Sequence, residues 1–214
     1  MISTVKGIVT WRRINQKIEG LDLSNTKGAR FDLNWSDQEL IDGCKRRSRK
    51  HEEVFFKRYY GFVMGIGLSY VKSRDQAQEI TQDSFMKFFD SLKKMDQAPS
   101  VKPWLRRITV NTAIDYYRKN KRIQNHEEAD GETPVFDPVY APDDLAYEEI
   151  LKLLYQLPED QQIVFNLYEV EGYSHREVAE QLNITESSSR VYLTRAKTKL
   201  RQLIKLHLKE YAGR

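Results

Sequence analysis

Apolar residues recur at steps of three and four along most of this 214-residue chain, which is the spacing of a buried helix face. Two such series are Phe55, Tyr59, Phe62, Val63, Ile66 and Tyr70, and Ala77, Ile80, Ser84, Phe85, Phe88 and Leu92. No segment shows the alternation of a β-strand, and 10 glycines and 6 prolines are few for a turn-rich β protein. The sequence therefore predicts an all-α fold.

The helical periodicity is interrupted by an acidic stretch, which predicts two small helical domains joined by a flexible linker. The expected parts are an N-terminal extension at 1–35, a domain at 36–122, an acidic linker at 123–147 and a domain at 148–214. Residues 123–150 contain nine acidic and no basic residues, and their three prolines favour an extended chain. Residues 36–122 contain 19 basic and 11 acidic residues. This separation of charge favours a polyanion as partner.

Several classes of protein are disfavoured by composition. No apolar run approaches the roughly 18 residues of a membrane span, and no signal peptide precedes the first domain, so a cytoplasmic location is expected. The single cysteine, Cys44, excludes an intramolecular disulfide. The four histidines are scattered, without the spacing of a zinc site, and no glycine-rich phosphate loop is present. Neither catalysis nor a cofactor is expected.

The segment 174–200 predicts two helices joined by a short turn. Ser174 and Glu177 match a capping box, and Asn183 suits the left-handed conformation that ends a helix. Thr185 is expected to cap the second helix. Its predicted buried stripe is Ser189, Leu193, Ala196, Leu200 and Leu203.

The opposite face of that second helix combines short polar, apolar and cationic side chains. Its members are Ser187, Ser188, Arg190, Val191, Thr194, Arg195 and Lys199. A slim helix end whose dipole attracts phosphate suits the major groove of DNA. A helical hairpin with a solvated face is the alternative, because the pattern tolerates many sequences.

Three motifs in a fixed order resemble a known family. They are "QEITQDSFMKFF" (78–89), "PWLRRITVNTAIDYYRKNKR" (103–122) and "LPEDQQIVFNLYEVEGYSHREVAEQLNITESSSRVYLTRAKTKL" (157–200). With the short linker between them, the chain resembles an extracytoplasmic-function (ECF) sigma factor, a small specificity subunit of bacterial RNA polymerase. The resemblance covers roughly 37–122 and 145–206. Ser189 departs from it, because the family usually has an aliphatic core residue there, and Val191 and Tyr192 stand where serine and arginine are common.

The resemblance implies partners and roles. The first motif is similar to the polymerase-binding helix, whose polar face here is Asp75, Glu79, Gln82 and Asp83; a merely solvated face is the alternative. The second is similar to the helix that recognises and melts the −10 promoter element, with candidates Lys102, Asn111, Arg118 and Lys119. The loop 96–102 corresponds to a pocket for a flipped base. The third is similar to the −35-binding domain. Implied partners are core polymerase (β′ clamp helices and β flap), promoter DNA and an anti-sigma factor.

Two alternatives in function remain open from the sequence. One is a helix-turn-helix regulator that acts without polymerase, and the other is an all-α adaptor with no role on DNA. Two local alternatives also remain. Trp104 either packs in the core, which Leu105 and Ile108 favour, or stacks on a single-stranded base. The acidic linker either occupies the RNA-exit channel of polymerase, as the resemblance implies, or is only a soluble tether.

Overall fold

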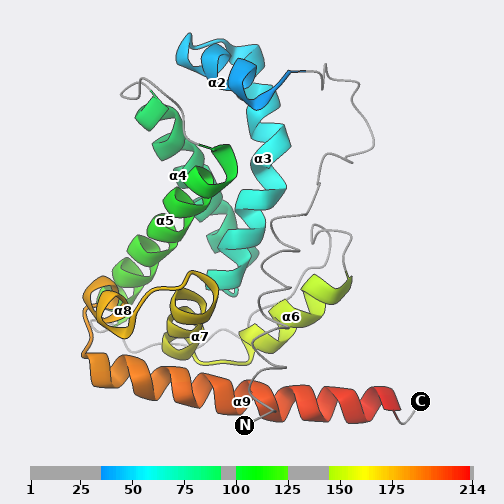
Figure 1. The fold of residues 1–214 in the computed structure, drawn as a ribbon, viewed down its shortest axis with the longest axis vertical. Helices are drawn as coiled ribbons and strands as arrows, with labels where there is room; N and C mark the ends of the chain where they lie inside the picture. The colour runs from blue at the N-terminus through cyan, green and yellow to red at the C-terminus, as the bar shows by residue number, and fades with distance from the viewer. Residues whose placement is uncertain (1–34, 93–99, 125–144, 213–214) are drawn as a thin grey trace. The chain divides into compact units, whose positions relative to one another are not determined.

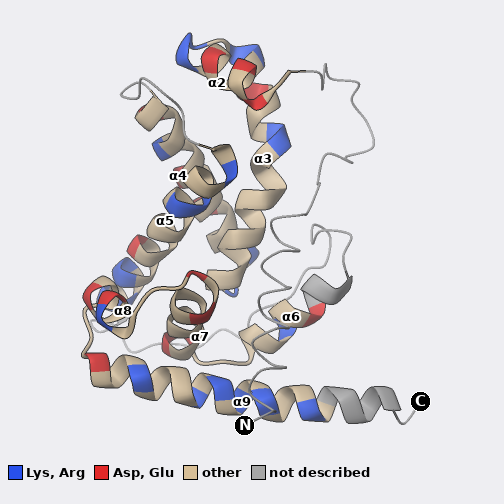
Figure 2. Cartoon of the chain, in the orientation of Figure 1, with Lys and Arg blue, Asp and Glu red and all other residues tan. Residues whose placement is uncertain are grey.

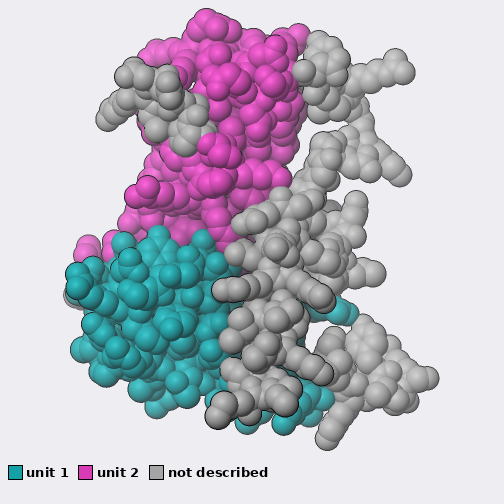
Figure 3. Space-filling model, in the orientation of Figure 1, with its two compact units in different colours: residues 1–17, 138–214 teal, residues 18–137 magenta. Residues whose placement is uncertain are grey.

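The structure, a computed structural model, describes residues 35–92, 100–124 and 145–212. Every regular element in these ranges is a helix (Figure 1). The chain divides into two compact units (Figure 3). In chain order of their helices, the first unit is residues 18–137, drawn in magenta, and the second unit is residues 1–17 with 138–214, drawn in teal. The all-α prediction and the prediction of two helical regions are confirmed. The N-terminal extension and most of the predicted linker lie outside the described residues.

In its described part, the first unit contains four helices. They are α2 (Asp37–Lys45), α3 (Arg49–Tyr70), α4 (Arg74–Leu92) and α5 (Val101–Gln124). A capping box starts α2, since the Ser36 amide donates to Glu39 Oε2 at 2.7 Å and the Glu39 amide donates to Ser36 Oγ at 3.2 Å. Helices α2 and α3 are separated at Arg47, whose φ of 56° is left-handed. A left-handed residue cannot continue a right-handed helix, so the chain turns between α2 and α3.

Aromatic rings form the core of this unit. Phe55 of α3 stacks on Phe88 of α4 at 4.6 Å between centroids, and it meets Phe85 edge-on at 6.4 Å. Trp104 of α5 lies 4.6 Å from the Phe88 ring. Such pairs combine a large buried area with a preferred geometry, and they fix α3, α4 and α5 against each other. Trp104 is half-buried and contacts this core through Phe88, which favours the packing alternative, although part of its surface is exposed.

Small residues allow α3 and α4 to approach closely. A Cβ on Gly67 would lie 3.2 Å from the Ala77 carbonyl oxygen, closer than most side chains come. The buried hydroxyls of Thr81 and Ser84 donate to carbonyls one turn earlier in α4, at 2.7 and 2.6 Å. Burying these polar groups therefore leaves no hydroxyl without a partner.

The second unit is built around a long C-terminal helix. Its described elements are α6 (Leu145–Tyr155), α7 (Glu159–Phe165), the π-helical segment η2 (Asn166–Val170), α8 (His175–Leu182) and α9 (Glu186–Ala212). Helices α6, α7 and α8 all contact α9. Gly172, with φ of 80°, turns the chain after η2, a conformation that glycine adopts without strain. Helices α6 and α7 are separated at Pro158, which is the N-cap residue of α7.

Candidate nucleic-acid and polymerase interfaces

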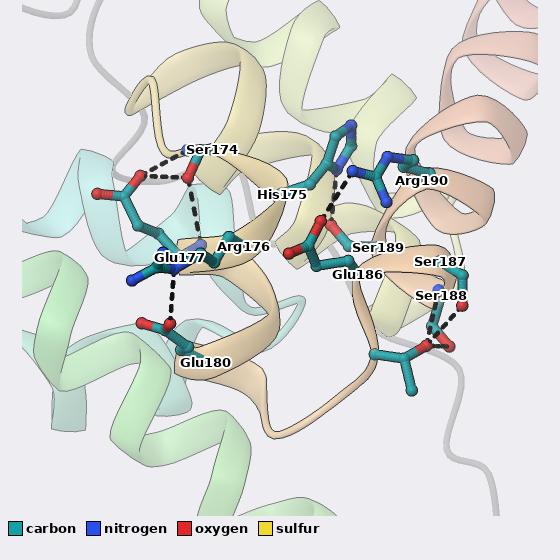
Figure 4. Close-up of polar contacts among 11 residues, drawn as sticks. Ser174, His175, Arg176, Glu177, Glu180, Glu186, Ser187, Ser188, Ser189 and Arg190 are labelled. Carbon is teal, nitrogen blue, oxygen red and sulfur yellow. Dashed lines mark hydrogen bonds and ion pairs between the residues drawn. The ribbon is translucent and has the colours of Figure 1, made fainter.

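Helices α8 and α9 form the predicted helical corner, and its end signals are in place (Figure 4). The Ser174 amide donates to Glu177 Oε2 at 2.7 Å, while the Glu177 amide donates to Ser174 Oγ at 3.3 Å. Asn183 has φ 53° and ψ 48°, the left-handed conformation predicted for it. The Ser188 amide donates to Thr185 Oγ1 at 3.0 Å, which confirms Thr185 as the cap of α9. The turn is therefore specified by local hydrogen bonds.

The rotation of α9 about its axis is set by one buried stripe. Its members are Ser189, Leu193, Ala196, Leu200 and Leu203. The opposite face contains the exposed side chains of Ser187, Arg190, Val191, Thr194, Arg195 and Lys199, with Ser188 half-buried. Val191 is 44% exposed, which is high for an apolar side chain. The fold thus presents all seven −35 candidates on the solvent side of one helix.

The candidates on the first turns of α9 differ in how far they are already engaged. Arg190 pairs with Glu186 at 2.8 Å (Figure 4). The hydroxyls of Ser187 and Ser188 lie 2.8 and 2.9 Å from Thr185 Oγ1. Arg195 is exposed and has no ion-pair partner in the part of the chain that the structure describes. Its guanidinium can therefore contact a ligand without first losing a bond within the protein.

His175 is a residue of this corner that the sequence analysis missed. Its Nδ1 lies 2.9 Å from Oγ of the fully buried Ser189 (Figure 4). Its ring also stacks on Tyr168, with 4.3 Å between the ring centroids. Burial lowers the pKa of His175 below its usual value, and the nearby charge of Arg190 lowers it further. The contact explains how a serine occupies a core position of α9, because the imidazole satisfies its hydroxyl. The departure at Ser189 was the signal for such a partner.

The −10 candidates lie on α5 but not on one face. Asn111 and Lys119 are exposed, and Arg118 is half-buried with its guanidinium 3.6 Å from Asp115. Seven residues separate Asn111 from Arg118, almost two full turns, so both lie on one side. Lys102 precedes Asn111 by nine residues and lies about half a turn away, with Nζ 5.8 Å from the centroid of the Phe62 ring. Of the predicted 96–102 loop the structure describes only residues 100–102, and it corrects the boundary, since Val101 and Lys102 already belong to α5.

The polar face predicted on α4 is present. Asp75, Glu79, Gln82 and Asp83 are all exposed, opposite the residues that α4 buries against its neighbours. Met86 lies on the same face and is 64% exposed. The sequence analysis omitted Met86, although the helical spacing from Gln82 and Asp83 places it there. The face is therefore an acidic surface with an exposed apolar side chain at its C-terminal end.

Two features of other protein classes are absent from the described ranges. None of the helices there is long and apolar enough to cross a membrane. Among the same residues, no group of three or more His, Cys, Asp or Glu side chains is arranged to hold a metal ion.

Comparison with known families matches both helical regions. The family described as "Sigma-70 region 2" matches residues 55–123, and "Sigma-70, region 4" matches residues 147–200. Together these matches cover more than half of the chain.

Individual relatives agree with this assignment. The ECF RNA polymerase sigma factor SigX of Bacillus subtilis is 31% identical over 64% of this chain and 74% of its own length. The ECF RNA polymerase sigma-E factor of Haemophilus influenzae is 26% identical over 76% of this chain and 92% of its own length. Among solved structures, the sigma factor RpoE of Bartonella quintana, in complex with the anti-sigma factor NepR, is 23% identical. The structural match covers 67% of this chain and 89% of the RpoE chain, with a TM-score of 0.43. The chain belongs to the ECF group of the sigma-70 family, the non-enzymatic subunits that direct RNA polymerase to initiate transcription.

Proposed function

We propose that the exposed face of α9 recognises the −35 promoter element in the major groove. The supporting observation is Arg195, an exposed guanidinium without an ion-pair partner in the described residues, on the face opposite the buried stripe. Arginine is the most frequent bidentate donor to guanine, and Val191 beside it suits contact with a thymine methyl group. Arg190 reaches the same groove only by exchanging its bond to Glu186 for one to DNA.

The test replaces Arg195 by alanine in the holoenzyme and measures binding to a promoter fragment selected by the unmodified holoenzyme. Loss of a base contact costs about 1–3 kcal/mol, or roughly 5- to 150-fold in Kd. Arg201→Ala is the matched control, since Arg201 is an exposed arginine on the same helix that lies beyond Lys199, the last candidate, and about 9 Å along the axis from Arg195. Equal affinity of both variants, with an unchanged −35 footprint, contradicts the proposal.

We assign the −10 element to α5 and the loop before it. Asn111 is exposed and is a residue type that bonds adenine in two places, while Arg118 and Lys119 suit phosphates of the same strand. Lys102 would contact DNA from the other side of the helix, next to the loop. Variants of Asn111 are expected to form the closed complex and fail to open it, and premelted templates should restore their transcription. Loss of the closed complex itself would instead indicate a structural role.

The acidic face of α4 is proposed to bind core polymerase at the β′ clamp helices. A negative surface repels DNA phosphates, and exposed methionine is enriched in protein interfaces. The proposed contact residues are Asp75, Glu79, Gln82 and Asp83, and we add Met86, which lies next to Gln82 and Asp83 on the same face. Region 4 is expected to contact the β flap in the same complex.

Family membership supports three further proposals, which concern the linker, a protein partner and the place of action. The linker is proposed either to occupy the RNA-exit channel or to act only as a soluble tether. An anti-sigma factor is an expected partner, although no described surface identifies it. The place of action is expected to be the cytoplasm, where polymerase works.

A further inference from the structure

The corner between α2 and α3 is the most basic short segment of the described chain. Residues 45–50 contain five cations and no acidic residue, and Figure 2 shows this corner coloured mainly as Lys and Arg. Arg46, Arg47 and Arg49 are exposed, and none has an ion-pair partner in the described ranges. Of the nearby carboxylates, Asp37 pairs with Arg58, Glu53 pairs with Lys57, and Asp42 accepts a hydrogen bond from Gln38. Glu52 also lies in the first turn of α3, so the corner keeps a net positive charge but not an exclusively positive surrounding.

The corner is held in one conformation by its own contacts. The Ser48 amide donates to the Gly43 carbonyl at 3.1 Å, and Ser48 Oγ lies 2.7 Å from His51 Nδ1. The His51 ring packs directly on the backbone of Gly43, where any Cβ would overlap it, and it stacks on Trp35 at 4.1 Å. The arginines therefore project from a preorganised support, which reduces the entropy lost when they bind a ligand.

Three of these cations stand where local preference opposes them, whereas Lys45 and Arg46 lie at the C-terminal end of α2, where the helix dipole favours positive charge. Arg49 and Lys50 occupy the first turn of α3, where the helix dipole disfavours positive charge. Arg47 adopts a left-handed backbone conformation that glycine or asparagine adopts with less strain. Departures from local preference at several adjacent positions are typical of functional sites.

We propose that Arg46, Arg47 and Arg49 bind the phosphate backbone of promoter DNA, independently of its sequence. Planar guanidinium groups are suited to phosphate oxygens. The corner lies on the unit that contains α5, at the end where α4 finishes, so a strand held by α5 has a second contact on the same unit (Figure 1). The polymerase-facing surface proposed on α4 is acidic, which argues against the basic corner as part of the same protein interface. This inference goes beyond the −35 and −10 assignments; only the idea of a second contact on the same strand rests on the function proposed for α5.

The test measures binding of the full chain to labelled single-stranded oligodeoxythymidine over a range of salt concentrations. The neutral variant is Arg46→Gln, Arg47→Asn and Arg49→Gln. The slope of log affinity against log salt is expected to become less steep by about 2, since each lost contact to a single strand contributes about 0.7. A variant with lysine at all three positions should keep the parental slope.

The matched control removes the same charge elsewhere, through Lys57→Gln, Arg201→Gln and Lys205→Gln, and its slope should change less. Helix content by circular dichroism identifies any variant that misfolds, and the lysine variant then carries the comparison. An unchanged slope in the neutral variant overturns the proposal. If that variant keeps its slope but loses affinity for core polymerase without DNA, the corner is a protein-binding surface instead.

Discussion

Replacing Ser189 by alanine removes one buried hydrogen bond from the helix-turn-helix and almost no volume. Ser189 is fully buried, and its Oγ lies 2.9 Å from His175 Nδ1. A buried hydrogen bond contributes about 0.5–1.5 kcal/mol net, so we expect Ser189→Ala to cost about 1 kcal/mol. His175→Phe keeps an aromatic ring on Tyr168 but leaves the Ser189 hydroxyl without a partner. That variant should cost about 1–3 kcal/mol.

The double variant separates this bond from other effects. It lacks both polar groups, so no unpartnered group remains, and its cost should be less than the sum of the single costs by about 1 kcal/mol. Hydrogen exchange of amides in α8 and α9 is the suitable assay, because it reports the stability of this unit without averaging over the other. Single costs that add to within about 0.3 kcal/mol would refute the coupling.

The same histidine makes the unit sensitive to acid. Burial lowers the pKa of His175 in the folded state. As the pH falls, the imidazole of the unfolded chain is therefore protonated at a higher pH than that of the folded chain. The contribution of neutral His175 to the free energy of unfolding is therefore complete above about pH 6.5, and it is lost as the pH falls through the lowered folded-state pKa. In His175→Phe the protection of α8 and α9 should vary less between pH 7 and pH 5. Equal pH dependence in both proteins would show that other groups cause it.

The remaining predictions concern the first unit and the linker. Asp83→Lys should weaken binding to core polymerase while helix content is kept, with the exposed Glu53→Lys as control; normal competition with other sigma factors would mean that the face is only solvated. Gly43→Ala should destabilise the first unit by about 1–3 kcal/mol, since the new Cβ would lie 2.1 Å from the His51 ring, and His51→Ala should recover part of the loss in thermal denaturation. Neutralising five acidic residues of the linker together (Glu127, Glu128, Asp130, Glu132 and Asp137) should weaken holoenzyme assembly and alter the ratio of abortive to full-length transcripts. Unchanged assembly and transcript ratio would identify the linker as a tether.

Local features of this protein could be predicted from the sequence because they depend on residues within a few positions of each other. The capping boxes at Ser36 and Ser174 use side chains three residues apart, and the left-handed Asn183 ends α8 by its own conformational preference. The exposed face of α9 follows from a stripe of helical period. The order of three such motifs also indicated the family, which the comparisons confirm.

Tertiary structure decided what depends on residues far apart in the chain. The bond between His175 and Ser189 spans fourteen residues, and only the packing of α8 on α9 brings the two groups together. The break at Arg47 is also tertiary, since the contact of His51 with Gly43 holds α2 and α3 in a turn that arginine does not prefer. Helical periodicity specifies which side of a helix is apolar, but packing determines which polar groups on that side find partners. For this reason the sequence located the exposed face of α9, and the fold showed how a serine on the buried side of that helix is accommodated.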